Sequence, residues 1–544
     1  MSAAWRTRAL ARLADESFDA LIVGGGATGA AIARDAALRG LRVALCDHGD
    51  FAGQTSSHSS KLIHGGLRYL QYGNLPLVFE GLAERHRLLL TAPHLCRPIE
   101  FLFPAYRGQS PSLLALGVGV TVYDALALWR SPVRSRRVGA AETYRLAPAL
   151  RSAGLRGAQL YVDCQTDDAR LVLENVLDAE SAGAVVASYV HVQAPAEGRT
   201  PARGPLLAED RLGHDTFPIH AQAVVNAAGP FSDAFRGGAP ILRPTLGVHL
   251  VFDAARLPTG GRAIVINSPR DGRLIFTLPA GARTIVGTTD TEWRPSGVAP
   301  SPRDEIRARG PDVDYLLEAA NHAFPPAALG RQEVVSTFAG LRPLINHGDS
   351  ASASATSREH DIWIDRTGVL TVVGGKLTTM RRMAEEAVDK LVELLRTRGV
   401  DRPLGRCETA TRPLPGAVRP PDLDGRELAA DVRARLEGAY GARAGQVAAI
   451  AGVHESLARR LVPDLPYLRA EVVFAARHDH AMAVEDVLQR RVPLFRDAAD
   501  QGASVLDDVS HLMAAELGWS ELDRSASIAQ YRTSAAIAAA WRGE

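Results

Sequence analysis

Residues 19–47 carry the feature that most constrains the fold of this chain. A short apolar run is followed at once by Gly24, Gly26 and Gly29, then by a stretch of good helix formers, and then by a second apolar run that ends at Asp47. Short apolar runs with β-branched residues suit buried strands, and alanine-rich segments favour helices. The order of these segments predicts a β-α-β unit with glycines at its first turn.

The spacing of the glycines has a physical reason in a dinucleotide site. Gly24 permits the tight turn, Gly26 lets the backbone approach a pyrophosphate, and Gly29 lets the helix pack closely on the strand. The helix start offers N–H groups and the positive end of its dipole to phosphate. Asp47 lies about 20 residues further on, where a carboxylate can accept hydrogen bonds from ribose hydroxyls. A glycine-rich turn in another kind of α/β protein would leave the position of Asp47 as a coincidence.

Composition narrows the class of protein. The chain has 544 residues, of which 46% are hydrophobic and 23% charged, as in a soluble globular protein of two or three domains. The net charge of +1 and the lack of a basic tract give no reason to expect nucleic acid as a partner. The four cysteines lie far apart, which disfavours a metal site or a disulfide framework and favours a reducing compartment. The charged N-terminus has no apolar signal core, so we expect no secretory peptide.

A segment rich in hydroxyls, small residues and cations follows the second strand, at residues 50–70. Its serine and threonine side chains and its exposed backbone can hydrogen-bond a polar ligand. A solvated loop can have the same composition, but it has no need for Lys61, His64 and Arg68 beside a Gly-Gly pair.

Six runs of sequence point to one known family. The run SSKLIHGGLRYL at 59–70 is the most specific, and the chain thereby resembles the FAD-dependent glycerol-3-phosphate dehydrogenases, the membrane-associated, quinone-reducing enzymes of bacteria and mitochondria. The resemblance extends along most of the chain. The other runs are YVDCQTDDARLVLEN (161–175), VVNAAGP (224–230), VGTTD (286–290), AGLRP (339–343) and VGGKLTT (373–379).

The resemblance implies a cofactor, a reaction and an electron acceptor. FAD would take a hydride from sn-glycerol 3-phosphate, giving dihydroxyacetone phosphate, and the electrons would pass to a membrane quinone, either ubiquinone or menaquinone. The residues expected to hold FAD are Gly24, Gly26, Ala27, Thr28, Gly29, Asp47, Thr55, Ser56, Ser57, Ser60, Lys61, Leu62, Ala228, Gly229, Gly375, Lys376, Leu377 and Thr378.

The residues expected to carry the reaction have separate tasks. The family places its catalytic base at the motif that holds His249, and an imidazole suits proton removal near neutral pH. Lys376, at the expected start of a helix that follows a second strand–glycine turn, would place positive charge near the flavin ring. Arginines hold a phosphate dianion best through their forked donors. The candidates for this task are Arg68, Arg342 and Arg358, with Tyr69 as a supporting donor.

The sequence departs from the family just before His249. The family often has a cation and a serine there, whereas this chain has Thr245, Leu246, Gly247 and Val248. The sequence leaves open what Thr245 and Val248 do to the substrate contacts.

The expected fold class is α/β, with a Rossmann-like FAD-binding domain, an antiparallel-sheet substrate domain and an all-helical C-terminal domain. The FAD-binding domain is discontinuous in sequence, and the stretch rich in proline and glycine near residue 410 is expected to be a linker. The boundaries are 17–90, 155–228 and 340–397 for the FAD-binding domain, 91–154 and 229–339 for the substrate domain, 398–424 for the linker and 425–544 for the helical domain.

Residues 112–129 are the most apolar stretch of the chain, but Asp124 and two glycines argue against a membrane span. Arginines follow at 130, 134, 136 and 137, as in a helix that lies on an anionic membrane surface. A helix buried in the substrate domain, with solvated arginines, is the alternative. The family resemblance favours a peripheral protein on the cytoplasmic face of the inner membrane, and the sequence leaves a homodimer open.

Other functions remain as alternatives. An oxidase of the same fold would hand its electrons to oxygen and make peroxide. A relative that acts on amines or 2-hydroxy acids is disfavoured by the three arginines and the 59–70 run. An iron–sulfur-coupled anaerobic relative is disfavoured because the C-terminal region lacks paired cysteines. A flavin-holding protein without turnover is disfavoured by the presence of both His249 and Lys376.

Overall fold

The β-α-β unit forms at the expected residues. Strand β1 (Ser17–Val23), helix α2 (Ala27–Leu38) and strand β2 (Val43–Cys46) follow one another, and the two strands pair in parallel. Glycines, short apolar runs and helix formers are local signals, which is why the sequence predicts this unit well. The computed structural model describes residues 3–109, 111–128, 130–195, 204–236, 240–295, 302–346, 360–423 and 427–544.

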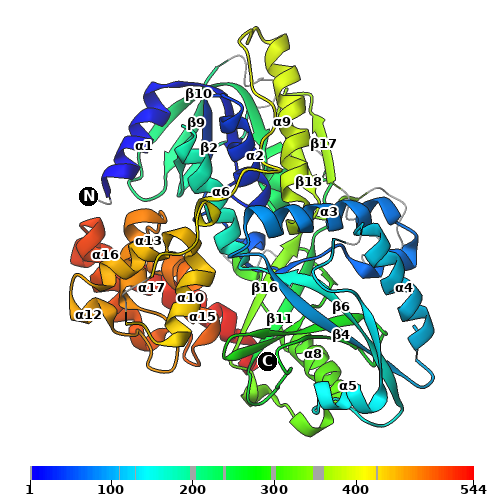
Figure 1. The fold of residues 1–544 in the computed structure, drawn as a ribbon. Coiled ribbons are helices and arrows are strands. Elements are labelled where there is room, and N and C mark those ends of the chain that lie inside the picture. The colour runs from blue at the N-terminus through cyan, green and yellow to red at the C-terminus, as the bar shows by residue number, and fades with distance from the viewer. Residues whose placement is uncertain are drawn as a thin grey trace.

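The unit belongs to the first of two large sheets, seen at the top of Figure 1. Its strands run in the order β17-β18-β10-β1-β2-β7, parallel throughout except at the β17 edge, with β8 and β9 attached to β10. The strands not yet given are β7 (Val185–Ala187), β8 (Val190–Val192), β9 (Leu206–Asp210), β10 (Thr216–Asn226), β17 (His360–Ile364) and β18 (Leu370–Gly374). The helices of this region are α1 (Ala3–Asp15), α6 (Asp168–Ser181), α7 (Ser232–Arg236) and α9 (Met380–Thr397).

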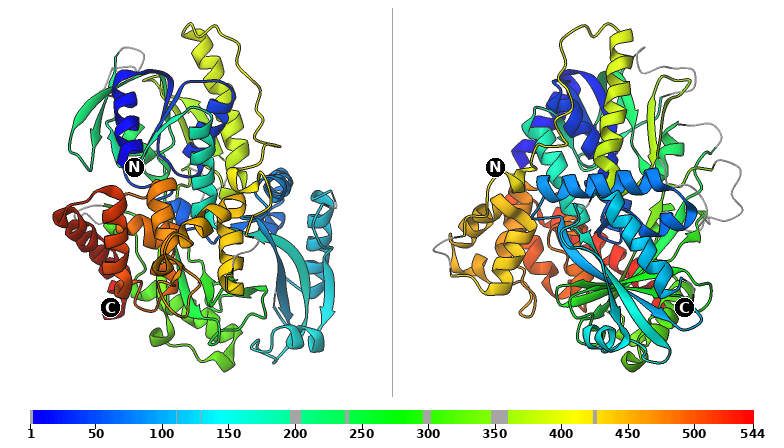
Figure 2. Two further views of the ribbon diagram at one scale, coloured as in Figure 1. Left: turned by 60° about the vertical axis from the view of Figure 1, so that its left-hand side comes forward. Right: turned by 45° about the vertical axis from the view of Figure 1, so that its right-hand side comes forward.

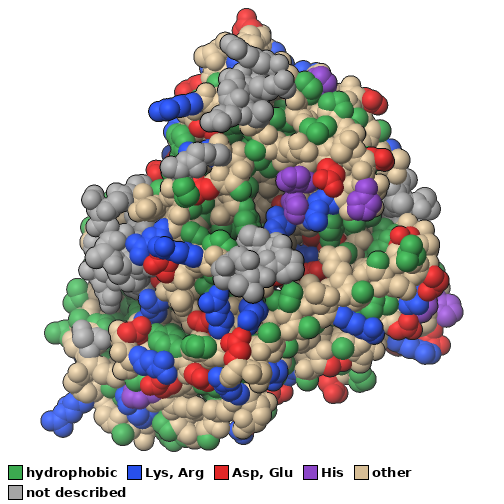
Figure 3. All heavy atoms as spheres, turned by 180° about the vertical axis from the view of Figure 1, so that it is seen from behind, with side chains coloured by type: hydrophobic (Ala, Val, Ile, Leu, Met, Phe, Trp, Pro, Cys, Tyr) green, Lys and Arg blue, Asp and Glu red, His purple; other side chains and the backbone are tan. Residues whose placement is uncertain are grey.

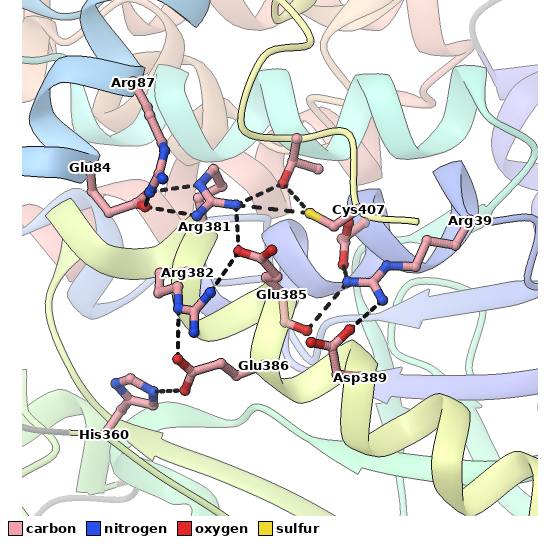
Figure 4. A network of polar contacts seen from close by, with 12 residues as sticks. Arg39, Glu84, Arg87, His360, Arg381, Arg382, Glu385, Glu386, Asp389 and Cys407 are labelled. Carbon is pink, nitrogen blue, oxygen red and sulfur yellow. Dashed lines mark hydrogen bonds and ion pairs between the residues drawn. The ribbon is translucent and has the colours of Figure 1, made fainter. Parts of the chain in front are cut away.

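Ion pairs anchor α9 on both sides (Figure 4). Arg381 of α9 donates through two nitrogens to Glu84 of α3 (Leu75–Thr91), at 2.7 Å each. Arg39, at the end of α2, pairs with Asp389 at 2.5 Å. Both groups of the Arg381–Glu84 pair are buried, so breaking that pair would leave an uncompensated buried charge. The turn that leads into α9, with Lys376, is therefore attached to a helix that α2 and α3 both hold in place.

The second sheet lies below the first in Figure 1 and is mainly antiparallel, with one parallel pair between β4 and β12. Its strands are β3 (Leu62–Ile63), β4 (Arg97–Tyr106), β5 (Arg136–Gly139), β6 (Leu155–Gln165), β11 (Thr245–Asp253), β12 (Ala263–Asn267), β13 (Leu274–Ala280), β14 (Arg283–Gly287), β15 (Thr291–Glu292) and β16 (Ser336–Arg342). Helices α4 (Leu113–Leu126), α5 (Ala140–Leu146) and α8 (Gly310–Ala323) pack around it.

One expected domain boundary differs from this arrangement. The segment 155–165, expected in the FAD-binding domain, forms β6 and pairs with β4 and β5 of the second sheet. Only the helix that follows it, α6, packs against α2. Long-range strand pairing of this kind leaves no local mark in the sequence.

The C-terminal region, residues 427–544, is built of helices joined by turns and short irregular segments, and Figure 2 shows it beside both sheets. The preceding segment is docked rather than extended, because Gly405 N donates to Arg39 O at 2.9 Å and Leu414 N donates to Thr91 O at 2.8 Å. The helices of the C-terminal region are α10 (Ala430–Tyr440), α11 (Ala444–Ala451), α12 (Glu455–Ala458), α13 (Arg469–His478), α14 (Val484–Asp486), a π-helical turn (Val487–Arg491), α15 (Leu494–Asp497), α16 (Leu506–Leu517) and α17 (Glu521–Ala539).

Helix α4 combines features of both interpretations of the apolar stretch. One face is buried, with Leu116 and Val120 in an apolar cluster, while Leu114 and Val118 on the other face are 73% and 59% exposed. The arginines at 130, 134, 136 and 137 are all exposed. Within the described ranges, no helix has both the length and the apolar character needed to cross a bilayer.

Candidate active site

A cavity lies between the two sheets, at the carboxyl ends of β1, β10 and β18. This is where open parallel sheets bind ligands. The turns after these three strands line one side, and His249 and Arg342 of the second sheet line the other. Figure 3 shows a recess near the middle of the face opposite to that of Figure 1, with histidine and basic side chains beside it.

The glycine-rich turn forms one wall of the cavity. Gly24 has φ +108°, and a Cβ on it would lie 2.5 Å from Ala227 O, so this backbone passes too close to β10 for a side chain. Gly26 precedes α2 and offers no side-chain cap of its own, so an anion can approach the helix start beside Ser56, whose Oγ accepts from Ala27 N. Gly29 does not line the cavity; a Cβ there would lie 1.8 Å from Gly24 O, so its task is close packing. The turn therefore has the shape that a diphosphate needs.

Asp47 also lines the cavity, at the end of β2. Its carboxylate accepts hydrogen bonds from Gly25 N at 2.6 Å and from Gly49 N at 2.8 Å. Burial raises the pKa of Asp47, and these two donors and the charge of Arg303 oppose that rise. Each carboxylate oxygen keeps a second lone pair, so ribose hydroxyls can still be accepted.

The hydroxyl-rich segment contributes side chains of two kinds. Ser56 Oγ accepts from Ala27 N at 2.9 Å and thereby joins the segment to the start of α2. Lys61 does not line the cavity; its Nζ lies 2.5 Å from Asp168 on α6. Ser57, expected at the cofactor, likewise lies outside the cavity wall. The expected cofactor residues that do line it are Gly24, Gly26, Ala27, Thr28, Asp47, Thr55, Ser56, Ser60, Leu62, Ala228, Gly229, Gly375, Lys376, Leu377 and Thr378.

The turn after β18 brings Lys376 to the cavity. Gly374 and Gly375 have φ of +79° and +75°, and a short 3₁₀ turn (Leu377–Thr379) separates them from α9. The sequence predicts Lys376 at the start of the α-helix. In the structure Lys376 instead precedes α9 by one 3₁₀ turn. Its Nζ lies 3.8 Å from the centre of the Tyr69 ring. Tyr69 itself lines a neighbouring, more apolar cavity.

His249 is buried in the middle of β11, and one edge of its ring reaches the cavity. Its Nε2 lies 2.9 Å from Ser60 Oγ, and its ring stacks on Phe338 of β16 at 4.5 Å between centroids. Gly287 of the neighbouring strand β14 pairs with His249, and a Cβ on Gly287 would lie 2.2 Å from the imidazole. Burial, with the charges of Arg342 and Lys61, lowers the pKa of His249 well below its usual value. The imidazole is therefore neutral at pH 7.

Arg342, at the end of β16, points its guanidinium toward the same part of the cavity. It donates to Thr289 O at 3.1 Å, to Asp290 Oδ1 at 3.2 Å and to Thr288 Oγ1 at 3.1 Å. A Cβ on Gly247 would lie 2.6 Å from its Nη2, so a glycine in β11 leaves room for the guanidinium.

The other residues named from the sequence lie in three different situations. Thr245 and Val248 are fully buried within the second sheet and are not part of the cavity wall, whereas Gly247 of the same segment lines the cavity beside Arg342. The backbone of Arg68 lies in a 3₁₀ segment (Leu67–Tyr72), but its side chain is not among the described atoms. Arg358 lies outside the described residues.

The cavity residues that were absent from the sequence-based set include Arg303 and His64. Arg303 lines the cavity near Asp47, with its guanidinium 5.0 Å from the centre of the Phe231 ring. His64 lines both this cavity and the neighbouring one. No local pattern marks Arg303, whereas His64 lies within the 59–70 run and could have been included.

Comparison with protein families covers most of the chain. Residues 19–381 match the model described as FAD dependent oxidoreductase, and residues 407–524 match the model described as the C-terminal domain of alpha-glycerophosphate oxidase. The first match contains the glycine-rich turn, His249, Arg342 and Lys376.

Individual proteins match over nearly the full length. The chain is 35% identical to the glycerol-3-phosphate dehydrogenase of Synechocystis, over 95% of this chain and 96% of that protein. It is 36% identical to the probable mitochondrial glycerol-3-phosphate dehydrogenase of Caenorhabditis elegans, over 95% of this chain and 73% of that protein. The X-ray structure of the glycerol-3-phosphate dehydrogenase from Bacillus halodurans complexed with FAD superposes with a TM-score of 0.78 at 29% identity, covering 99% of this chain and 98% of that chain.

Proposed function

The chain belongs to the FAD-dependent glycerol-3-phosphate dehydrogenases, and we propose that it oxidises sn-glycerol 3-phosphate to dihydroxyacetone phosphate and delivers the electrons to a membrane quinone. The observation that carries this proposal is the meeting of His249, Arg342 and Lys376 at one cavity with the glycine-rich turn. A neutral base, a phosphate-binding cation and a cofactor cradle are what this oxidation needs.

The cavity wall fits FAD from end to end. The start of α2 and the backbone of Gly24 and Gly26 would hold the diphosphate, and Asp47 would hold the ribose of the adenosine. Lys376 would set positive charge beside the other end of the cofactor. Bound FAD supplies the ring that accepts the hydride.

Arg342 is our principal candidate for the substrate phosphate. It is fixed by three hydrogen bonds to the segment 288–290 and faces the cavity close to His249. A guanidinium held in this way presents its forked donors to a phosphate with little further loss of freedom. Arg68 and Arg358 stay as proposed partners in phosphate binding, with Tyr69 as a supporting donor.

His249 is the proposed base for the substrate hydroxyl. Because burial, together with the cations around it, holds the pKa of His249 low, the ring is unprotonated when substrate arrives. A phosphate dianion beside Arg342 would offset part of the cationic field and raise the pKa of the imidazole toward neutrality. Substrate binding would thus make His249 a stronger base at the moment when it must accept a proton.

The cavity beside helix α4 supports the proposal that the electron acceptor is a membrane quinone. The neighbouring cavity of about 390 Å³ is lined by Val118 and Val122 of α4 and extends to Leu62 and His64, which also line the main cavity. The exposed apolar face of α4 rims this cavity. We propose that this face rests on the cytoplasmic side of the inner membrane and that a quinone approaches the flavin through this cavity.

A double substitution on α4 tests the docking face. Leu114→Glu with Val118→Glu should weaken binding to vesicles of anionic lipid and slow reduction of long-chain quinone, because two exposed apolar side chains become charged. Reduction of a water-soluble dye should be unchanged. Leu522→Glu on α17 is the matched control, since Leu522 is 79% exposed but lies on the helical domain. Equal vesicle binding by both variants would remove α4 from this role.

An oxidase is the second candidate, because the matched C-terminal family model takes its description from alpha-glycerophosphate oxidase. The two functions differ in their acceptor. With sn-glycerol 3-phosphate and oxygen alone, a dehydrogenase should form little peroxide, and turnover should rise when a quinone is added. Peroxide formed in step with substrate consumption, without any effect of quinone, would favour the oxidase.

A further inference from the structure

The wall of the cofactor cavity is held from behind by the helical domain. Asp50 lies three residues beyond Asp47 and is buried. Its carboxylate accepts hydrogen bonds from two consecutive arginines of the helical domain, from Arg490 Nε and from Arg491 Nη1 and Nη2, the last at 2.8 Å. Both guanidinium groups are almost fully buried, so these contacts are not screened by solvent.

The chain leads from Asp50 directly to the phosphate-binding turn. Phe51 packs so closely on Gly25 that a Cβ there would lie 2.5 Å from the phenyl ring. Ala52 N donates to Gly25 O at 3.0 Å. The residues that follow, 52–56, line the cavity, and Ser56 is bonded to the start of α2. A shift of Asp50 would therefore be passed to the turn within one or two residues.

The two arginines are themselves fixed. They end a π-helical turn (Val487–Arg491), a geometry that recurs at functional sites. Arg490 pairs with Asp486 at 2.9 Å, and Tyr189 of the cofactor side donates to the same carboxylate at 2.6 Å. Arg491 donates to Asp479 O at 2.8 Å. Two arginines and two aspartates balance in charge, so the cluster is an ordered and neutral unit.

We propose that Arg490 and Arg491 are positioning residues for FAD, and that the helical domain is thereby a working part of the cofactor site. They touch neither the cavity nor the substrate, and act through Asp50 on the segment that carries the cavity wall. The proposal assigns to residues 486–491 a task in cofactor affinity that is separate from their contribution to stability.

Arg491→Lys tests the proposal against Arg443→Lys. Arg443 is a matched control because it also joins the helical domain to the cofactor side, through the buried Glu174 of α6 at 3.4 Å, and it pairs within the helical domain with Asp479 at 2.5 Å. Each variant is stripped of FAD and titrated with it by flavin fluorescence, and its Tm is measured without FAD. We expect Arg491→Lys to raise the Kd for FAD about tenfold and Arg443→Lys to change it less than about twofold, at similar losses of Tm.

Equal Kd values for the two variants and the unmodified protein would overturn the proposal, because the arginines would then serve stability alone. Asp50→Asn is the second variant. It keeps the shape of the side chain while weakening both contacts, and should raise the Kd for FAD in the same way. If Arg491→Lys does not fold, Asp50→Asn decides, and an unchanged Kd in that variant also overturns the proposal.

Discussion

The two ends of the cavity are built in different ways. The phosphate end is made of backbone, with Gly24, Gly26 and Gly29 lying within one turn of chain. The substrate end is made of side chains on separate strands, with His249 in β11 and Arg342 in β16. The first depends on steric room, which local sequence provides. The second depends on strand register, which only the folded sheet provides.

This difference predicts two kinds of defect. Substitutions at the phosphate end should abolish cofactor binding, and substitutions at the substrate end should leave FAD bound and impair turnover. The following changes test whether the division holds.

The largest effect is expected at Gly29. Gly29→Ala places a Cβ 1.8 Å from Gly24 O, so α2 must move away from β1. We expect a loss of about 3 kcal/mol in the free energy of unfolding and a protein purified without flavin. Flavin content and Tm are the measurements. Gly119→Ala is the control, because no atom lies within 4 Å of its Cβ in α4 and FAD should be retained. A yellow, stable Gly29→Ala protein would contradict the packing argument.

His249→Ala should have the next largest effect. Without a base for the hydroxyl proton, kcat should fall by about 10²- to 10⁴-fold while FAD stays bound, since His249 lies on the substrate side. Flavin content and steady-state kinetics measure the two properties separately. Loss of FAD together with activity would break the division between the two ends, and a near-normal kcat would remove His249 from the role of base.

Arg342→Gln should raise KM for sn-glycerol 3-phosphate by about 10- to 100-fold, because charge-assisted hydrogen bonds to the phosphate are lost. Arg342→Lys keeps the positive charge but loses the forked pair of donors, so its KM should lie between those of the unmodified protein and Arg342→Gln. An unchanged KM in Arg342→Gln would move the phosphate site elsewhere in the cavity.

The smallest effect is a shift in the pH profile. Arg342 helps to lower the pKa of His249, so its removal should raise that pKa. Protonation disables the base, hence the acid limb of kcat/KM should move to higher pH in Arg342→Gln and stay in place in Arg342→Lys. The ionisation of the substrate phosphate is common to all three proteins and cancels in the comparison. A limb that does not move would mean that another group controls it.

The phosphate end could be read from the sequence because its determinants are local. Glycine spacing, flanking strands and Asp47 lie within 30 residues, and the structure arranges them as expected. His249 was predicted from a motif, but its contacts with Ser60 and Phe338 depend on pairing between β11 and β16 and on a loop 189 residues away.

The directions in which side chains point could not be predicted from the sequence. The sequence predicts Lys61 at the cofactor. Nothing in the hydroxyl-rich segment around Lys61 indicates that its side chain pairs with Asp168 instead. Tyr69 faces the neighbouring cavity, although Lys376 lies over its ring. The contact between Asp50 and Arg490 joins residues 440 positions apart. Such contacts are set by tertiary packing alone.

The absorption spectrum of the purified protein, recorded without oxygen before and after addition of sn-glycerol 3-phosphate, tests the central claim most directly. The account predicts the bands of bound oxidised flavin, which bleach when substrate is added and return when a quinone follows. A protein that stays colourless when offered FAD, or flavin bands that substrate leaves unchanged, would contradict it.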